Sequence, residues 1–221
     1  MDTPIETIEY RGYEIEIHID TCSEDPRDAW DNITTMICFH KHYSLGDKHD
    51  YRSDDYNSWD EVEAQIVRDF NPVIIQRLFL YDHSMLSIST RSWVGRAHHA
   101  EWDSGVVGFV FITRKSVQDF IGWKRITKER MKKLEEYLKG DVETYDSWLT
   151  GNVYGYVIND YGDHLNSCWG YYGDTKYVIS EAKSEIDYHI NYLRKKHLDR
   201  LKTWIRNRVP LQNRTPLQLA L

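Results

Sequence analysis

Residues 102–113 read Trp102-Asp103-Ser104-Gly105-Val106-Val107-Gly108-Phe109-Val110-Phe111-Ile112-Thr113, and this stretch decides the predicted fold. A polar turn opens it, and from Val106 to Thr113 β-branched and aromatic side chains follow almost without interruption. Apolar residues fall on both faces of the expected strand, which is typical of a strand buried on both sides. We therefore place this strand in the middle of a sheet and build the rest of the chain around it.

The flanking sequence predicts an α+β fold. Strands are expected in a hairpin over 7–20, at 33–43, at 73–81 and 85–90, and in a second hairpin over 152–172. The capping-box pattern from Ser58 to Glu61 opens a helix to about Phe70, and further helices are expected over 127–140 and 142–149. Apolar residues at helical spacing predict a last helix over 176–209. The prediction is a largely antiparallel sheet of about seven strands flanked by helices, with a core domain over 1–175 and a long basic C-terminal helix and tail over 176–221.

Composition narrows the class of protein. The chain has 221 residues, enough to bury a substantial core, and its 16 Tyr and 8 Trp suit binding faces as well as cores. No apolar run reaches the length of a membrane span, and the first residues lack a secretion-signal layout. Three cysteines without a CxxC pair fit a reducing compartment. We expect a cytoplasmic protein of a bacterial host cell, with no membrane partner and no cofactor.

Charge is distributed unevenly along the chain. The net charge is −7, but residues 1–63 hold 17 acidic and 5 basic side chains, whereas the remainder holds 18 and 23. One interpretation is a solvated loop and a solvated helix face. The other is two binding surfaces: an acidic one for a basic partner, and a basic helix for nucleic acid or a second copy of the chain. The candidate binding residues are Asp47, Asp50, Asp54, Asp55, Asp60, Glu61, Arg194, Lys195, Arg200 and Trp204.

Metal binding is one candidate chemistry. Cys38 and His40 share a strand face and Asp47 follows closely, and all three residue types can ligate zinc. No second pair of ligands in a structural spacing accompanies them, and ten histidines produce chance clusters, so the favoured interpretation is one buried cysteine among surface histidines.

Acid–base or nucleophilic chemistry is a second candidate. His83 and Asp103 lie in two turns and Cys168 in a later strand, and a folded sheet could bring the three together. Asp103 and Ser104 are also ordinary turn residues, and Ser104 does not stand in a Gly-x-Ser-x-Gly elbow. The glycines near Trp169 match neither a Walker pattern nor a dinucleotide fingerprint.

Five groups of residues stand out along the chain: Trp102 to Phe109, Cys38-Phe39-His40 with Leu45-Gly46-Asp47, Tyr81 to Ser84, Glu143-Thr144-Tyr145 with Leu149-Thr150-Gly151, and Ser167 to Gly173. Together they resemble motifs of a family of uncharacterised proteins common in phages and mobile elements. The resemblance covers roughly residues 8–190, and this chain has Met85 where similar sequences tend to have Gly. The family has no established activity, so the resemblance implies a setting and no catalytic residues, and the basic terminal helix looks like an addition to the family core.

The functional prediction follows from the resemblance, the acidic first third and the Tyr and Trp content. We expect a phage-type accessory protein that binds and inhibits a host defence nuclease or another nucleic-acid-handling complex, of the anti-CRISPR or anti-restriction type. The alternatives are a small cytosolic enzyme, hydrolase-like, that uses His83, Asp103 and Cys168, and a dimeric regulatory protein joined through the terminal helix.

Overall fold

The computed structural model describes residues 3–210. Within them the chain divides into two compact units. Unit 1 comprises residues 3–18, 154–169 and 174–210, and unit 2 comprises residues 19–153 and 170–173. The long C-terminal helix belongs to the same unit as strands from the beginning of the chain.

The sheet of unit 2 contains the stretch that decided the prediction. Its order is β3 (Thr35–Cys38), β6 (Ser104–Thr113), β4 (Pro72–Asp82) and β5 (Leu86–Ser89), and neighbouring strands are antiparallel. β6 lies between β3 and β4, and Val107 to Ile112 are all buried. The predicted central strand, apolar on both faces, is therefore confirmed.

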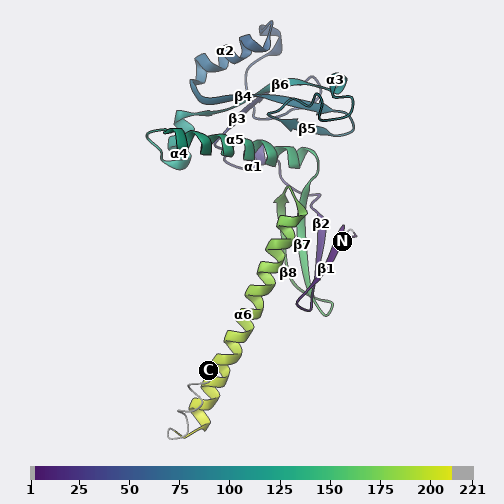
Figure 1. Cartoon of the computed structure of the whole chain (residues 1–221), viewed down its shortest axis with the longest axis vertical. Coiled ribbons are helices and arrows are strands. Elements are labelled where there is room, and N and C mark those ends of the chain that lie inside the picture. The colour runs from purple at the N-terminus through teal and green to yellow at the C-terminus, as the bar shows by residue number, and fades with distance from the viewer. Residues whose placement is uncertain (1–2, 211–221) are drawn as a thin grey trace. The chain divides into compact units, whose positions relative to one another are not determined.

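Helices cover the two faces of this sheet (Figure 1). On one face α2 (Trp59–Phe70) packs Val62 and Ile66 against Phe109 and Phe111. On the other face Val110 and Ile112 pack with side chains of α4 (Arg114–Ile121) and α5 (Lys128–Leu149). α5 runs unbroken through Gly140, where two helices were predicted. A glycine inside a helix costs only about 1 kcal/mol, and the buried stripe continues across it from Leu138 to Val142.

Most of the second sheet belongs to unit 1. Its order is β1 (Glu6–Tyr10), β2 (Tyr13–Ile19), β7 (Val153–Asp160) and β8 (Asp163–Tyr172). The α+β class and the antiparallel pairing are confirmed, and the strands are distributed over two sheets of four. Alternation of apolar and polar residues locates strands but does not say which strands pair, so the sequence alone did not separate the two sheets.

The long C-terminal helix α6 (Thr175–Arg208) packs on the sheet of unit 1 through its first half only. Val178, Ala182 and Ile186 are buried, and Asp187 accepts hydrogen bonds from the hydroxyl of Tyr10 at 3.3 Å. Among the described residues no helix is long and apolar enough to cross a membrane. The short elements α1 (Pro26–Ala29), η1 (Ser53–Asp55) and α3 (Ala100–Asp103) belong to unit 2.

Candidate functional site

Residues 39–58 form a long connection between β3 and α2, here called the 39–58 loop. Gly46 pairs with Ile37 in an isolated antiparallel bridge, which folds the loop back onto the strand it has just left. A Cβ at Gly46 would lie 2.7 Å from the carbonyl oxygen of Met36, and its φ of +69° is the left-handed region that glycine adopts at little cost. The bridge therefore requires glycine here.

A buried ion pair fixes the same part of the loop. Arg27 donates from Nε to Oδ1 of Asp47 at 2.8 Å and from a terminal nitrogen to Oδ2 at 2.7 Å, a bidentate pair. Its remaining donors reach the hydroxyl and the carbonyl of Thr34. The amide of Met36 also donates to Asp47, at 2.9 Å. Since the Arg27 side chain is only 2% exposed, Asp47 is a structural anchor and is not available to a partner.

The hydroxyl of Tyr145 also holds the loop, and the Cys38 thiol is buried beside it. The amide of Gly46 donates to the hydroxyl of Tyr145 at 2.9 Å, and burial raises the pKa of that hydroxyl, so it stays protonated. Burial also raises the pKa of the Cys38 thiol to about 12, helped by the nearby charge of Asp47. A thiol that stays protonated at neutral pH is a poor nucleophile and a poor metal ligand.

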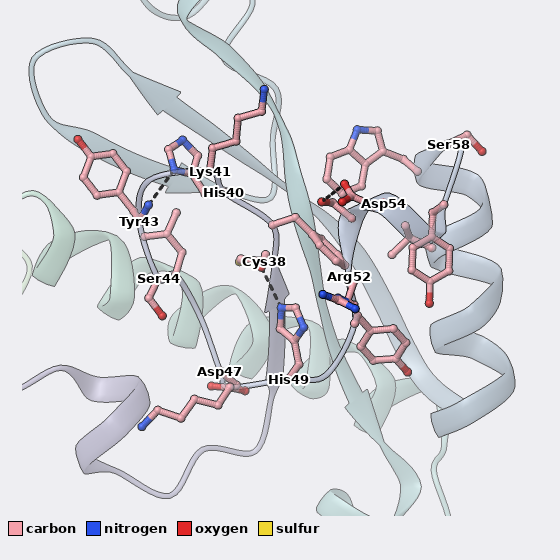
Figure 2. Close-up of a pocket in the computed structure, with 18 of the residues that line it drawn as sticks. Cys38, His40, Lys41, Tyr43, Ser44, Asp47, His49, Arg52, Asp54 and Ser58 are labelled. Carbon is pink, nitrogen blue, oxygen red and sulfur yellow. Dashed lines mark hydrogen bonds between the residues drawn. The ribbon is translucent and has the colours of Figure 1, made fainter.

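The loop and the start of α2 surround a pocket of about 810 Å³ (Figure 2). This volume lies in the range of small-molecule and side-chain binding sites. His49 lies at the middle of the pocket with Arg52 beside it. The aromatic side chains that line it are Phe39, Tyr43, Tyr51, Tyr56 and Trp59.

His49 has a defined tautomer. Its Nε2 lies 2.9 Å from the carbonyl oxygen of Cys38, and since a carbonyl can only accept, Nε2 carries the hydrogen. Nδ1 is buried and has no hydrogen-bond partner among residues 3–210. In the neutral ring Nδ1 is an acceptor, so a group that enters the pocket with a donor can satisfy it.

The predicted acidic residues separate into bound and unbound ones. Asp60 pairs with Arg77, which also contacts Glu63 at 3.2 Å. Glu61 accepts from the amide of Asn57 at 2.8 Å, one residue before the amide that a strict capping box would use. The carboxylates without an ion pair in the described part of the chain are Asp50, Asp54 and Asp55, all exposed; Asp54 accepts a hydrogen bond from the hydroxyl of Ser53 at 3.2 Å.

The candidate metal ligands do not converge. Cys38 is buried, His40 lies 4.0 Å from Asp82, and Asp47 is occupied by Arg27. Within residues 3–210 no group of three or more His, Cys, Asp or Glu side chains could hold a metal ion.

The candidate catalytic residues are brought together in part. Nδ1 of His83, one residue after β4, lies 2.8 Å from Oδ2 of Asp103, the last residue of α3 and directly before β6. This contact orients the imidazole ring, and the His83 side chain is 49% exposed. The hydroxyl of Ser104 donates to the carbonyl of Ala100 and is not turned toward the histidine. Cys168 lies on β8 in unit 1, whereas His83 and Asp103 belong to unit 2.

The predicted basic residues lie on the second half of α6. Arg194, Lys195, Arg200 and Trp204 are all exposed. This segment belongs to unit 1, whereas the 39–58 loop belongs to unit 2.

Sequence reasoning missed Arg27 and Tyr145, and it considered His49 only as a neighbour of the candidate metal ligands. Arg27 follows a proline inside an acidic stretch, and that isolation was the one available signal for a buried partner of an acid. The hydroxyl of Tyr145 accepts a hydrogen bond from the amide of Gly46, 99 positions earlier, and no local pattern indicates such a contact.

Comparisons with protein-family models, with curated proteins and with solved structures find no match for this chain. The resemblance to phage proteins therefore stays a prediction.

Proposed function

We propose that this protein acts by binding, and that the 39–58 loop is its main contact surface. The observation that carries the proposal is the set of three exposed carboxylates, Asp50, Asp54 and Asp55, for which no described cation supplies a partner. Unpaired surface carboxylates attract a basic partner and accelerate its approach, and they cost little to bury partially at an interface rim.

Aromatic side chains beside these carboxylates supply the second requirement of an interface. Tyr43 is 48% exposed, and Tyr51, Tyr56 and Trp59 line the pocket next to it. Tyrosine and tryptophan dominate the binding energy of many protein interfaces, because each presents a large rigid apolar surface and a polar tip. A side chain of the partner would enter the pocket, and the carboxylates would surround it.

The loop is held in one conformation before binding. The Arg27–Asp47 pair, the Gly46 bridge and the Tyr145 hydroxyl fix its middle. A surface that is already ordered loses less conformational entropy when a partner binds. This supports a contact surface more than it supports a solvated connection, which needs no buried ion pair.

The partner we propose is a host nuclease or another nucleic-acid-handling complex. Such proteins present basic grooves for phosphate groups, and an acidic surface with an apolar pocket can occupy one of them. The resemblance to phage proteins gives this inhibition its setting, a conflict with host defence.

The test is capture from a bacterial lysate with the tagged full-length protein, followed by assay of the captured protein's nuclease activity. We expect a basic, nucleic-acid-handling protein to be retained in stoichiometric amount, and its activity to fall when the protein is added. Asp50→Asn, Asp54→Asn and Asp55→Asn together should abolish both effects.

The matched control removes the same charge from another face. Asp119, Glu135 and Glu136 are exposed on α4 and α5, which cover the opposite face of the sheet from α2. Changing them to Asn, Gln and Gln should leave capture and inhibition intact. If both triple variants lose the partner equally, net charge and not this loop is responsible, and the proposal fails.

A second candidate function rests on the 2.8 Å contact between His83 and Asp103. A carboxylate that orients a histidine supports general-base chemistry, such as activation of water for hydrolysis. The test is a screen of esters and phosphodiesters with wild type and Asp103→Asn. Turnover lost in the variant, with the circular dichroism unchanged, supports this candidate, and absence of turnover in the wild type removes it.

A further inference from the structure

Histidine side chains gather at one end of the sheet of unit 2, where β4 turns into β5 and α3 leads into β6 (Figure 1). The ring centroids of His83 and His99 are 6.4 Å apart, and those of His98 and His99 are 3.8 Å apart. All three residues are exposed. One histidine can act as a base, and a second at this distance can supply the acid that many group transfers also need.

The rings of His83 and His99 differ in their surroundings. Nδ1 of His83 lies 2.8 Å from the Asp103 carboxylate. Since a carboxylate can only accept, Nδ1 carries the hydrogen and Nε2 of the neutral ring keeps its lone pair, as a base requires. His99 pairs with no carboxylate in residues 3–210, and its φ of +55° is the left-handed region that glycine adopts at lower cost. Residues held in such conformations cluster at functional sites.

The surface beside the two rings suits a single-stranded nucleic acid. Trp102, directly before Asp103, is 86% exposed, and unpaired bases stack on such rings. Arg91 and Arg96 are exposed in the preceding loop, and the Arg96 guanidinium lies 4.9 Å from the ring centroid of Trp93. These cations can contact phosphates. The bases of a duplex are already stacked on one another, so a single strand is the expected ligand.

We propose that this site cleaves single-stranded RNA, with His83 as the base and His99 as the acid. Hydrogen bonds of about 2.8 Å to two oxygens of one phosphate can bridge rings at this separation. His83 takes the proton of a 2′-hydroxyl, whose oxygen bonds to the phosphorus while the bond from phosphorus to the 5′-oxygen breaks. Protonated His99 gives its proton to that 5′-oxygen. The products are a 2′,3′-cyclic phosphate and a 5′-hydroxyl; the proton returns from His83 to His99 through water, and nothing is oxidised or reduced.

This inference rests on the second candidate function, for which it names the substrate and the acid. It does not depend on the 39–58 loop or on a captured host protein. Activation of water needs only the base and acts on any reactive ester, whereas this reaction needs the 2′-hydroxyl of the substrate. Substrates with and without that hydroxyl therefore separate the two reactions.

The test is cleavage of a short, unstructured, labelled RNA by the full-length protein in the presence of EDTA, since neither proton transfer needs a metal ion. We expect 2′,3′-cyclic phosphate ends by mass spectrometry, and no cleavage of the same sequence made with deoxyribose. His83→Gln and His99→Gln should each lower kcat at least about 100-fold. Trp102→Ala should raise KM at least about fivefold with a smaller effect on kcat. The control His164→Gln, exposed on β8 in unit 1, should match the wild type.

An activated leaving group separates the acid from the base. Uridine 3′-(4-nitrophenyl phosphate) releases a phenolate that needs no proton. On this substrate His99→Gln should lose less than about fivefold in kcat, whereas His83→Gln should lose as much as it does on RNA. Equal losses for the two variants on this substrate would contradict the assigned roles.

Circular dichroism verifies that each variant is folded. Absence of RNA cleavage, cleavage of the deoxyribose strand, or equal rates for the wild type and both histidine variants, as a contaminating nuclease would give, overturns the proposal. Turnover of simple esters that needs Asp103, without cleavage of RNA, also overturns it and leaves activation of water as the second candidate function.

Discussion

Replacing Asp47 by alanine is the sharpest test of how the 39–58 loop is held. The change leaves Arg27 charged and 2% exposed, with only Thr34 as a partner. Removing one member of a buried ion pair typically costs about 3–5 kcal/mol. The Asp47 side chain is 25% exposed, so water can replace part of the lost contact, and we expect the lower end, about 3 kcal/mol.

The measurement is urea unfolding followed by circular dichroism, together with hydrogen exchange of peptides that cover 35–47. We expect a loss of about 3 kcal/mol in the free energy of unfolding, and faster exchange at the amide of Met36, which donates to Asp47. Asp50→Ala is the matched control, because Asp50 is exposed and its loss should cost less than about 0.5 kcal/mol.

The double variant Arg27→Met, Asp47→Leu separates charge from packing. Replacing a buried ion pair by apolar side chains of similar size is often neutral, so the double variant should recover most of the stability that Asp47→Ala loses. A loss below about 1 kcal/mol in Asp47→Ala would refute the reasoning, since it would mean that Arg27 has no need of this carboxylate.

Three further outcomes follow from single residues. Gly108→Ala should lower the free energy of unfolding by about 3 kcal/mol or more, measured by thermal unfolding, because the new Cβ would lie 1.9 Å from the carbonyl oxygen of Ile37 on the paired strand. Gly105→Ala is the control on the same strand and should be nearly neutral, because a Cβ there has nothing within 4 Å. An equal loss of stability in both variants would contradict the strand register. With iodoacetamide at pH 8.5, exposed Cys22 and Cys168 should be alkylated in the folded protein, whereas Cys38 should be alkylated only after unfolding, because it is buried and its thiol stays protonated. Equal rates of alkylation at all three cysteines, followed by mass spectrometry, would contradict this. Burial raises the pKa of Asp146 above its unfolded value of about 3.9, so the folded state binds the proton more tightly and stability should fall as pH rises through the range between the two values. Asp146→Asn, which keeps an acceptor oxygen for Ser87 and Ile88, should flatten that fall in unfolding curves from pH 4 to 7, and an unchanged pH profile would contradict it.

The sequence predicted local structure well and long-range pairing poorly. Val106 to Thr113 and the residues from Ser58 to Phe70 carry strong local signals, and the structure forms β6 and α2 from them. That β2 pairs with β7, more than a hundred residues later, depends on which apolar faces fit together. Periodicity reports the face of a strand and not its neighbour, so the two sheets were not separable.

The candidate sites show the same limit. His83 and Asp103 were predicted as partners because each lies in a turn beside a strand, and antiparallel pairing of β4 with β6 brings those turns together. Asp47 was predicted as a binding residue and is an anchor, since its partner Arg27 lies 20 positions earlier with no pattern to link them. A carboxylate in a sequence does not show whether a cation already neutralises it.

The most direct test of the account is the affinity for the captured host protein, measured by biolayer interferometry at 50 and 300 mM NaCl. The account predicts that Asp50→Asn, Asp54→Asn, Asp55→Asn weakens binding at least about tenfold at low salt and removes most of its salt dependence. It also predicts that the control variant with Asp119→Asn, Glu135→Gln and Glu136→Gln binds with the same affinity as the wild type. Equal affinities for all three proteins at both salt concentrations would contradict it.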